Sequence, residues 1–269
     1  MIPTSPDDKD FPWWLLIVVA TGAYLFWQVF TVEIYTKVLS TLSKGIWITI
    51  YVTVVSYSAA CILGLGLAVA ALSRSLILRQ IARLYVEIVR GIPIIVLLLY
   101  VAFVVAPGFV AGWNWLADAL GFDPIRTRDF PLLWRAVIAL TIAYSSFLAE
   151  VFRAGLQSVD AGQIEAAEAL GLNRWQRFRH IVFPQAFRTI MPPLGNDFVA
   201  MVKDSSLVSV LGVTDIAQLG KITAAGNFRY FETYNVVALV YLTMTITLSI
   251  GLRRFEKYLR QRPAARSDY

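Results

Sequence analysis

Two groups of charged residues have the types and spacing to do chemistry, and each interrupts an otherwise apolar chain. The first begins with Glu165-Ala166-Ala167, followed by Gly171 and Pro184; its acidic side chain beside small residues can pair with a basic partner at an interface. The second begins with Lys203-Asp204, followed by Ser205-Ser206, where opposite charges can hold the two charged ends of a zwitterion. These residues therefore indicate ion pairing and recognition, and we predict no catalytic residue.

The sequence offers no metal site and no site for a cofactor. Cys61 is the only cysteine and lies in an apolar run, which excludes an intrachain disulfide and a multi-cysteine metal site. His180 is the only histidine, so a catalytic triad or proton relay built on histidine has no support. We expect no cofactor in this chain.

The composition is that of an integral membrane protein. Apolar residues make up 58% of the chain and charged residues only 16%, whereas an ordinary soluble domain carries about 25% charge. The formal charge of +6 could suggest nucleic acid, but the lysines and arginines flank apolar runs and do not interleave with exposed aromatics. We therefore expect contact with membrane lipid and none with nucleic acid.

Six apolar stretches are long enough to cross a bilayer as helices, since its core of about 30 Å needs roughly 20 apolar residues. Pro107 and Gly108 mark the end of the third stretch, and Asp197, Lys203 and Asp204 interrupt the fifth. The prediction is an all-α polytopic protein. The six expected spans are residues 13–30, 45–72, 91–109, 131–152, 190–213 and 233–252.

The positions of lysine and arginine predict which connections face the cytoplasm, because cytoplasmic loops retain positive charge. Residues 73–90, residues 153–189 and the stretch after 252 are the arginine-rich connections, which puts both termini in the cytoplasm. The acidic start, with Asp7, Asp8 and Asp10, runs against this pattern, but acidic residues weigh little in it. We expect residues 13–30 to be a retained helix, because a basic flank is missing, and the tail at 259–269 to be disordered.

The connection at 160–184 carries helix start and stop signals. Asp160 with Gln163 predicts a capping box, and Gly171 predicts a left-handed end, so a helix is expected from about 161 to 170. Asn173 with Gln176 predicts a second helix that must end or bend at Pro184. The first helix would place three apolar residues on one face and two glutamates beside it, namely Ile164, Ala167, Leu170, Glu165 and Glu168. An ordinary surface hairpin is the alternative.

The spacing of this hairpin resembles the EAA signature of ABC importer permeases. Gly171 follows Glu165-Ala166-Ala167 after three residues, and Ile181 and Pro184 complete the pattern, with Phe183 where the family usually has leucine. Further stretches are similar to the polar amino acid permease family over residues 43–258. They are Gly45 to Thr49 with Ser56, Tyr85 to Pro93, Ala149 to Gly155, Pro184 to Ala186 with Asn196, and Lys203 to Leu207.

The resemblance implies a type I importer fold with a five-helix core at 43–258. Residues 1–42 would be an addition comprising a tail, an extra transmembrane helix and a periplasmic connection. The hairpin would be a cytoplasmic coupling loop gripped by an ATPase, with Glu165 pairing a basic group and Ala166, Ala167 and Gly171 allowing close approach.

The resemblance also implies partners in a bacterial cytoplasmic (inner) membrane. They are a second permease subunit, identical or related, two cytoplasmic ATPase subunits that hold ATP and Mg, and a periplasmic or extracellular amino acid binding protein. The chain itself has no phosphate-binding loop, because Gly220-Lys221 is followed by Ile222 and not by serine or threonine.

Lys203 and Asp204 are expected to face a bundle interior or a polar cavity, because charges at membrane depth cost several kcal/mol otherwise. In a substrate path, Lys203 would face a carboxylate, while Asp204 or Glu150 would face an ammonium group, with Ser205 and Ser206 nearby. The alternative is a mutual Lys203-Asp204 pair that stabilises a kink. Glu150 is one helical turn from Arg153, and a local ion pair is the favoured interpretation of it.

Two other classes of protein are compatible with the apolar spans. An ion-coupled secondary transporter or channel could use buried charges, but it would not require a capped cytoplasmic hairpin. A structural membrane anchor would gain nothing from charges inside a span. The importer permease is the interpretation that uses all these features.

Overall fold

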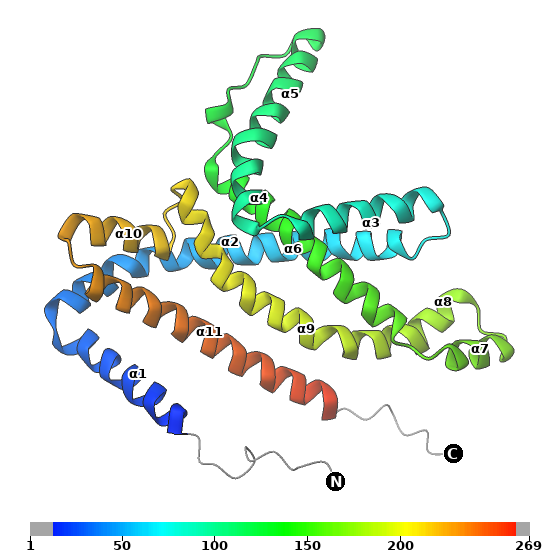
Figure 1. Cartoon of the computed structure of the whole chain (residues 1–269). Coiled ribbons are helices and arrows are strands. Elements are labelled where there is room, and N and C mark those ends of the chain that lie inside the picture. The colour runs from blue at the N-terminus through cyan, green and yellow to red at the C-terminus, as the bar shows by residue number, and fades with distance from the viewer. Residues whose placement is uncertain (1–12, 262–269) are drawn as a thin grey trace.

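The computed structural model describes residues 13–261, and every regular element in that range is a helix (Figure 1). Two short π-helical turns and two 3-10 turns connect or end the α-helices. The α-helices are α1 (Trp13–Thr31), α2 (Glu33–Ala71), α3 (Leu76–Gly91), α4 (Ile94–Tyr100), α5 (Ala106–Leu120), α6 (Leu132–Gln157), α7 (Ala161–Ala169), α8 (Arg174–Arg177), α9 (Phe183–Asp204), α10 (Ile216–Asn227) and α11 (Tyr230–Gln261). The short turns are η2 (Val101–Val105), η3 (Thr127–Asp129), η4 (Phe178–Val182) and η5 (Ser205–Leu211).

Within residues 13–261, four helices are long and apolar enough to cross a membrane. They are Glu33–Ala71, Ile94–Leu120, Leu132–Gln157 and Tyr230–Tyr258. A fifth span arises if Arg174–Leu211 and Ile216–Asn227, which are bent by 51° relative to each other, count as one broken span. The first expected span lies in α1, which is not among these helices.

The core of the bundle is the pairing of α2 with α6, which small residues bring close together. A Cβ on Gly64 would lie 3.0 Å from both Leu148 Cβ and the carbonyl oxygen of Ser145, so a larger residue would crowd this crossing. The buried Ser56 hydroxyl donates to the carbonyl oxygen of Val137 across the same interface at 3.3 Å. Figure 1 shows α3 folded back along the end of α2, and α5 directed away from the other helices.

The sequence predicted that the third span ends at Pro107 and Gly108. In the structure the span continues to Leu120. Helix α4 passes through the π-turn η2 into α5, and Pro107 sits in the first turn of α5. In the π-turn the Ala106 N–H donates to the Val101 carbonyl, and Pro107 has no N–H to offer to the carbonyl of Ala102. A proline is tolerated here because the irregular turn changes the hydrogen-bond register.

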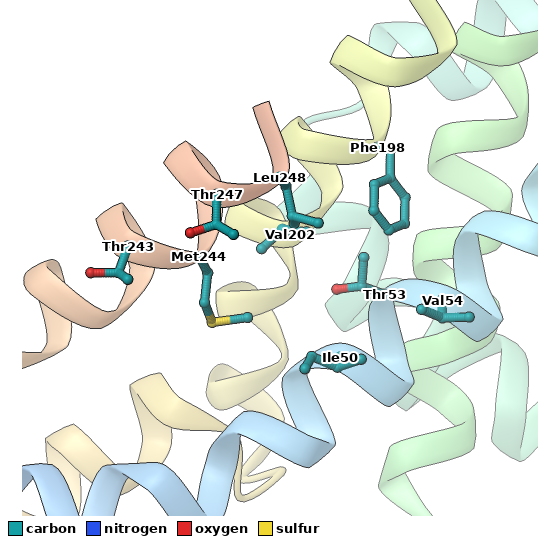
Figure 2. A pocket seen from close by; sticks show the side chains of 9 residues that line it. All are labelled: Ile50, Thr53, Val54, Phe198, Val202, Thr243, Met244, Thr247 and Leu248. Carbon is teal, nitrogen blue, oxygen red and sulfur yellow. The ribbon is translucent and has the colours of Figure 1, made fainter. Parts of the chain in front are cut away.

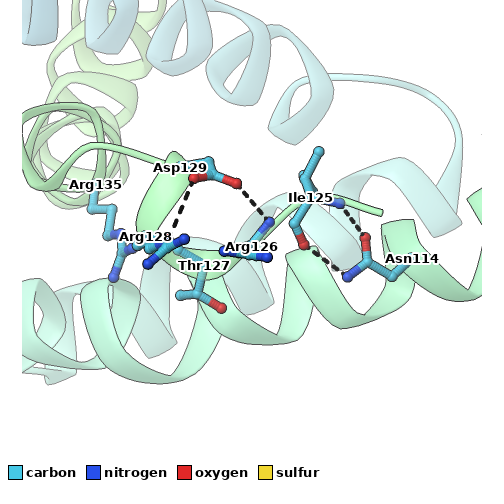
Figure 3. A network of polar contacts seen from close by, with 7 residues as sticks. All are labelled: Asn114, Ile125, Arg126, Thr127, Arg128, Asp129 and Arg135. Atoms are coloured by element: carbon cyan, nitrogen blue, oxygen red, sulfur yellow. Dashed lines mark hydrogen bonds and ion pairs between the residues drawn. The ribbon is translucent and has the colours of Figure 1, made fainter. Parts of the chain in front are cut away.

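Arg135 supplies the donor that the π-turn lacks. Its side chain is only 6% exposed, and its Nη1 donates to the carbonyl oxygen of Ala102 at 3.0 Å. The Nε atom donates to Phe130 O at 3.0 Å, and the second terminal nitrogen bonds the carbonyl of Thr127. Figure 3 shows Arg135 beside the connection that returns from α5 to α6, which the Asn114 amide also ties down through Ile125.

Several expected boundaries shift in the structure. Helix α2 begins at Glu33, twelve residues before the expected start at Gly45, so the proposed division between 42 and 43 falls inside one helix. Helix α11 continues to Gln261, and residues 262–269 of the expected tail lie outside the described residues, as do Asp7, Asp8 and Asp10. The fifth span changes from α-helix to 3-10 helix at Ser205 and turns at Gly212, where φ is +81°.

Candidate functional site

The hairpin at 160–184 is folded largely by local capping. Asn173 Oδ1 accepts from Gln176 N and Gln176 Oε1 accepts from Asn173 N, both at 2.9 Å, which confirms the predicted second capping box. At the start of α7, Asp160 Oδ1 accepts from Gly162 N at 2.8 Å. The predicted side-chain bonds between Asp160 and Gln163 do not form. The Gln163 side chain instead accepts from Gln185 Nε2 at 2.6 Å, which ties α7 to the start of α9.

Gly171 ends α7 in the left-handed conformation that the sequence predicted, with φ of +79°. Gly171 N donates to Glu168 O at 2.9 Å, and Leu172 N donates to Ala167 O at 3.1 Å, the two bonds of a Schellman end. Nothing would contact a Cβ at this position, so the backbone conformation alone selects glycine. The turn places α7 and α8 together at one end of the molecule (Figure 1).

The two glutamates of α7 have different environments. Glu168 Oε2 lies 2.9 Å from Arg177 Nη1, so this ion pair closes the hairpin between α7 and α8. Glu165 is exposed, and within residues 13–261 it makes no hydrogen bond or ion pair. Its carboxylate is therefore available to an external cation.

The predicted apolar face of α7 is only partly correct. Ala167 is buried, with 2% of its surface exposed, and Ile164 is half-buried. Leu170 is 80% exposed, because it is the C-cap residue at which the chain leaves the helix toward Gly171. Ala167 thus packs inside the hairpin, while Ala166, Glu165 and Leu170 form its outer surface.

A row of four aromatic rings runs along the second half of the hairpin into α9 and was not anticipated from the sequence. The rings contact one another in succession, with centroids 6.0, 5.9 and 5.7 Å apart; the first pair is stacked and the next two are tilted. They belong to Trp175, Phe178, Phe183 and Phe187. The π-turn η4 lies between Phe178 and Phe183, so Pro184 begins α9 and does not end the preceding helix. Phe183 replaces the leucine that the EAA signature usually has, and its ring contacts both Phe178 and Phe187.

Lys203 and Asp204 do not pair with each other within the described residues. Asp204 is half-buried, and its Oδ2 accepts from the hydroxyl of Tyr144 in α6 at 2.8 Å. Lys203 is exposed on a neighbouring face at the end of α9. A mutual pair that stabilises the kink is therefore not what the structure shows. Tyr144 is the residue that sequence reasoning missed, because it is 60 positions away.

The serines after Asp204 belong to the helix break itself. Ser205 is fully buried and donates its hydroxyl back to Val202 O at 2.8 Å. Ser206 is half-buried, and its carbonyl accepts from Ser209 Oγ at 2.7 Å. Bonds of this kind compete with the α-helical ladder and fit a change to 3-10 geometry.

Glu150 lies in a different cavity from Lys203 and Asp204. Its Oε2 is 2.5 Å from Arg153 Nη2, so the predicted local ion pair forms. The cavity around it is lined by α2, α3 and α6, and neither Lys203 nor Asp204 borders it. The structure therefore does not bring the residues expected in the substrate path into one site.

An apolar cavity of 420 Å³ lies between α2, α9 and α11 (Figure 2). Its walls include Ile50, Val54, Phe198 and Met244, together with three threonines, and no charged side chain lines it. The Thr53 hydroxyl is already bonded to the carbonyl of Thr49 at 2.8 Å. A cavity of this chemistry has no group that could fix the charged ends of an amino acid. Within the described residues there is also no group of histidine, cysteine and carboxylate side chains that could hold a metal.

The sequence and the fold of this chain are both similar to those of known transport proteins. The family model described as binding-protein-dependent transport system inner membrane component matches residues 60–264. The chain is 35% identical over 217 residues to the probable amino-acid permease protein YxeN of Bacillus subtilis, covering 81% of this chain and 90% of that one. It is 32% identical over 219 residues to the glutamine transport system permease protein GlnP of Escherichia coli, covering 81% and 93%. A crystal structure of an amino acid ABC transporter with histidines is similar at a TM-score of 0.69 and 33% identity, over 83% of this chain and 96% of that one.

The family model and both relatives cover most of the chain, so the class of protein is a membrane transport permease. The chain belongs to the family of binding-protein-dependent transport system inner membrane components. The matched region begins at residue 60, inside α2, so α1 and the first part of α2 lie outside it.

Proposed function

We propose that this chain is the permease subunit of an ATP-driven importer and forms the translocation path for a polar amino acid. The observation that carries the proposal is the hairpin at 160–184. Its exposed Glu165 and the left-handed Gly171 that ends α7 have the spacing of the EAA signature. The named relatives are amino acid and glutamine permeases, which supports this substrate class. An ion-coupled transporter or channel would give no reason for that hairpin.

In this proposal α7 is the coupling helix and docks into a groove on a cytoplasmic ATPase. Glu165 pairs with a basic group of the ATPase, since its carboxylate has no partner within the described residues, whereas Glu168 is held by Arg177. Ala166 and Gly171 keep the docking surface low, and the buried Ala167 packs α7 against the rest of the hairpin. ATP and Mg²⁺ are bound by the ATPase subunits, because this chain has no phosphate-binding loop.

The assembly would contain two permease subunits, identical or related, two ATPase subunits and an external amino acid binding protein. Six membrane-spanning helices, including α1, would put both termini in the cytoplasm of a bacterial cell. The arginine-rich connections that include the hairpin support this orientation.

We assign Lys203 and Asp204 to the substrate path, together with Ser205 and Ser206. Lys203 is exposed and can face a substrate carboxylate, while the Tyr144 hydroxyl fixes the Asp204 carboxylate that would face an ammonium group. Ser205 and Ser206 set the change in helix geometry beside these charges. Glu150, which was also expected in this path, pairs with Arg153 and lines another cavity, so we assign it no contact with substrate.

The substitution Gly171→Asp in the reconstituted importer tests the coupling role. We expect uptake to be abolished and ATPase activity to become independent of substrate, while the membrane-embedded permease pair stays intact by size-exclusion chromatography. Gly121→Asp is the matched control, because Gly121 is also a left-handed glycine at a helix end, with φ of +75°, but it ends α5. Normal uptake by Gly171→Asp would overturn the coupling assignment. Uptake that requires ATP and resists ionophores would separate an importer from an ion-coupled transporter.

A further inference from the structure

A second cavity, of 430 Å³, lies between the end of α2, the polar face of α3 and the end of α6. Its floor is apolar and built of small side chains, among them Ala68 and Ala82. Its rim is charged, with three arginines and two glutamates, namely Arg83, Arg90, Arg153, Glu87 and Glu150. We call this cavity the arginine groove.

The charges of the arginine groove do not balance among themselves. Glu150 forms an ion pair with Arg153. Arg153 also donates from Nη1 to Gln157 Oε1 at 2.7 Å. The Arg90 guanidinium lies 5.7 Å from the centre of the Phe147 ring. Neither Arg83 nor Arg90 forms an ion pair within the described residues, and Glu87 forms none either.

Three guanidinium groups therefore face two carboxylates on this rim, and Arg90 as well as Arg153 acts electrostatically on Glu150. The rim keeps one positive charge in excess. Guanidinium groups present a planar fork of donors that suits oxyanions such as phosphate, and they are weakly hydrated. An anionic ligand would neutralise the excess positive charge of this rim.

The groove lies at the end of the bundle that carries the hairpin. Helix α2 ends at Ala71, and Arg153 is near the end of α6, four residues before Gln157. The arginine-rich connections predict that this end faces the cytoplasm. The groove would then lie near the headgroups of the inner leaflet, where anionic lipids concentrate.

Helix α3 has the form of an interfacial helix beside this groove. The next face of α3 around the helix carries Ile77, Ile81, Leu84 and Ile88, which are all exposed by more than half. An amphipathic helix with arginine on one face and large apolar side chains on the adjoining face suits a lipid whose head is charged and whose chains are apolar. A free anion would make use only of the charged face.

We infer that the arginine groove binds the phosphate headgroup of an anionic phospholipid, with Arg83 and Arg90 holding the phosphate. The small apolar side chains of the floor receive the glycerol region, and the acyl chains lie along the exposed face of α3. This inference does not depend on the coupling role of the hairpin or on the transported substrate.

The test uses the full-length chain in a neutral detergent, with phosphatidylglycerol, phosphatidylcholine and inorganic phosphate as probes. Native mass spectrometry measures bound lipid, and thermal unfolding measures the shift in Tm that each probe causes. We expect phosphatidylglycerol to bind and to raise Tm, and the variant Arg83→Gln/Arg90→Gln to lose roughly tenfold or more in its affinity. Arg83→Lys/Arg90→Lys keeps the charge but loses the planar fork of donors, so its affinity should lie between those of the unsubstituted chain and the glutamine variant.

The matched control is Arg74→Gln/Arg254→Gln, which removes the same charge from two exposed positions outside the groove. It should bind phosphatidylglycerol like the unsubstituted chain. Equal binding by the groove variant would overturn the inference, and so would equal preference for phosphatidylcholine. A Tm increase with inorganic phosphate as large as that with phosphatidylglycerol would assign the groove to a free anion and overturn the lipid assignment.

Discussion

The hydroxyl of Tyr144 in α6 donates to Asp204 Oδ2 at 2.8 Å, at the point where α9 changes into the 3-10 turn η5. This bond fixes the orientation of a carboxylate that no lysine or arginine pairs within the described residues. It also leaves Lys203 exposed and free to meet another anion. Lys203 and Asp204 therefore do not pair with each other, which is what the proposed substrate site needs.

Tyr144→Phe should weaken substrate affinity by leaving the Asp204 carboxylate without its donor. A hydrogen bond to a charged group contributes about 1.5–3 kcal/mol, so we expect KM for uptake to rise by roughly tenfold or more. The measurement is uptake by reconstituted vesicles. Tyr100→Phe is the control, since Tyr100 is exposed on α4. An unchanged KM in Tyr144→Phe, Asp204→Asn and Lys203→Met would make this region structural.

Glu165→Gln and Glu168→Gln should differ although the two residues share one short helix. Glu165→Gln removes a charge that is free for the ATPase, so we expect substrate-stimulated ATPase activity and uptake to fall together. Glu168→Gln removes the ion pair with Arg177, whose side chain is only 16% exposed while that of Glu168 is 67% exposed. The hairpin loses some stability but keeps its docking charge, so uptake should fall less than in Glu165→Gln. Comparison of the two variants in the assembled importer measures this. Equal losses would contradict the assignment of the docking surface to Glu165.

The parts of this structure that could be predicted from sequence are those fixed over a few residues. The Asn173 and Gln176 capping box and the left-handed Gly171 form as expected, because each depends on backbone groups within one turn. Gln163 was assigned to a local cap but bonds Gln185, which only the folded hairpin brings near. The Asp204 partner likewise comes from another helix. Sequence patterns identify the charged residues, whereas the tertiary fold determines their partners.

Arg135→Met should destabilise the fold because it leaves the Ala102 carbonyl without a donor. A buried polar group that loses its partner costs about 1–3 kcal/mol, and the bond to Phe130 is lost as well. Thermal unfolding in detergent should show a lower midpoint. Pro107→Ala restores an N–H to this turn, so the loss caused by Arg135→Met should be smaller in that background. Strict additivity of the two substitutions would show that Arg135 does not compensate for the proline.

Gly45→Ala should destabilise the packing of α2 against α10. An added Cβ would lie 2.6 Å from the carbonyl carbon of Asp215 and from Ile216 N, which are backbone atoms that cannot move aside cheaply. The buried Asp215 caps α10 by accepting from Gln218 N at 2.8 Å and also accepts from Tyr241 OH at 3.1 Å, so a shift of α10 would disturb both bonds.

Overpacking of this kind costs about 1–3 kcal/mol, and thermal unfolding of the full-length chain should reveal the loss. Gly66→Ala is the control in the same helix, because nothing lies within 4 Å of a Cβ there. The control should be neutral or slightly stabilising, since alanine favours a helix over glycine by about 1 kcal/mol. If both substitutions raised the unfolding midpoint equally, the close approach of α2 and α10 would not be a constraint on the fold.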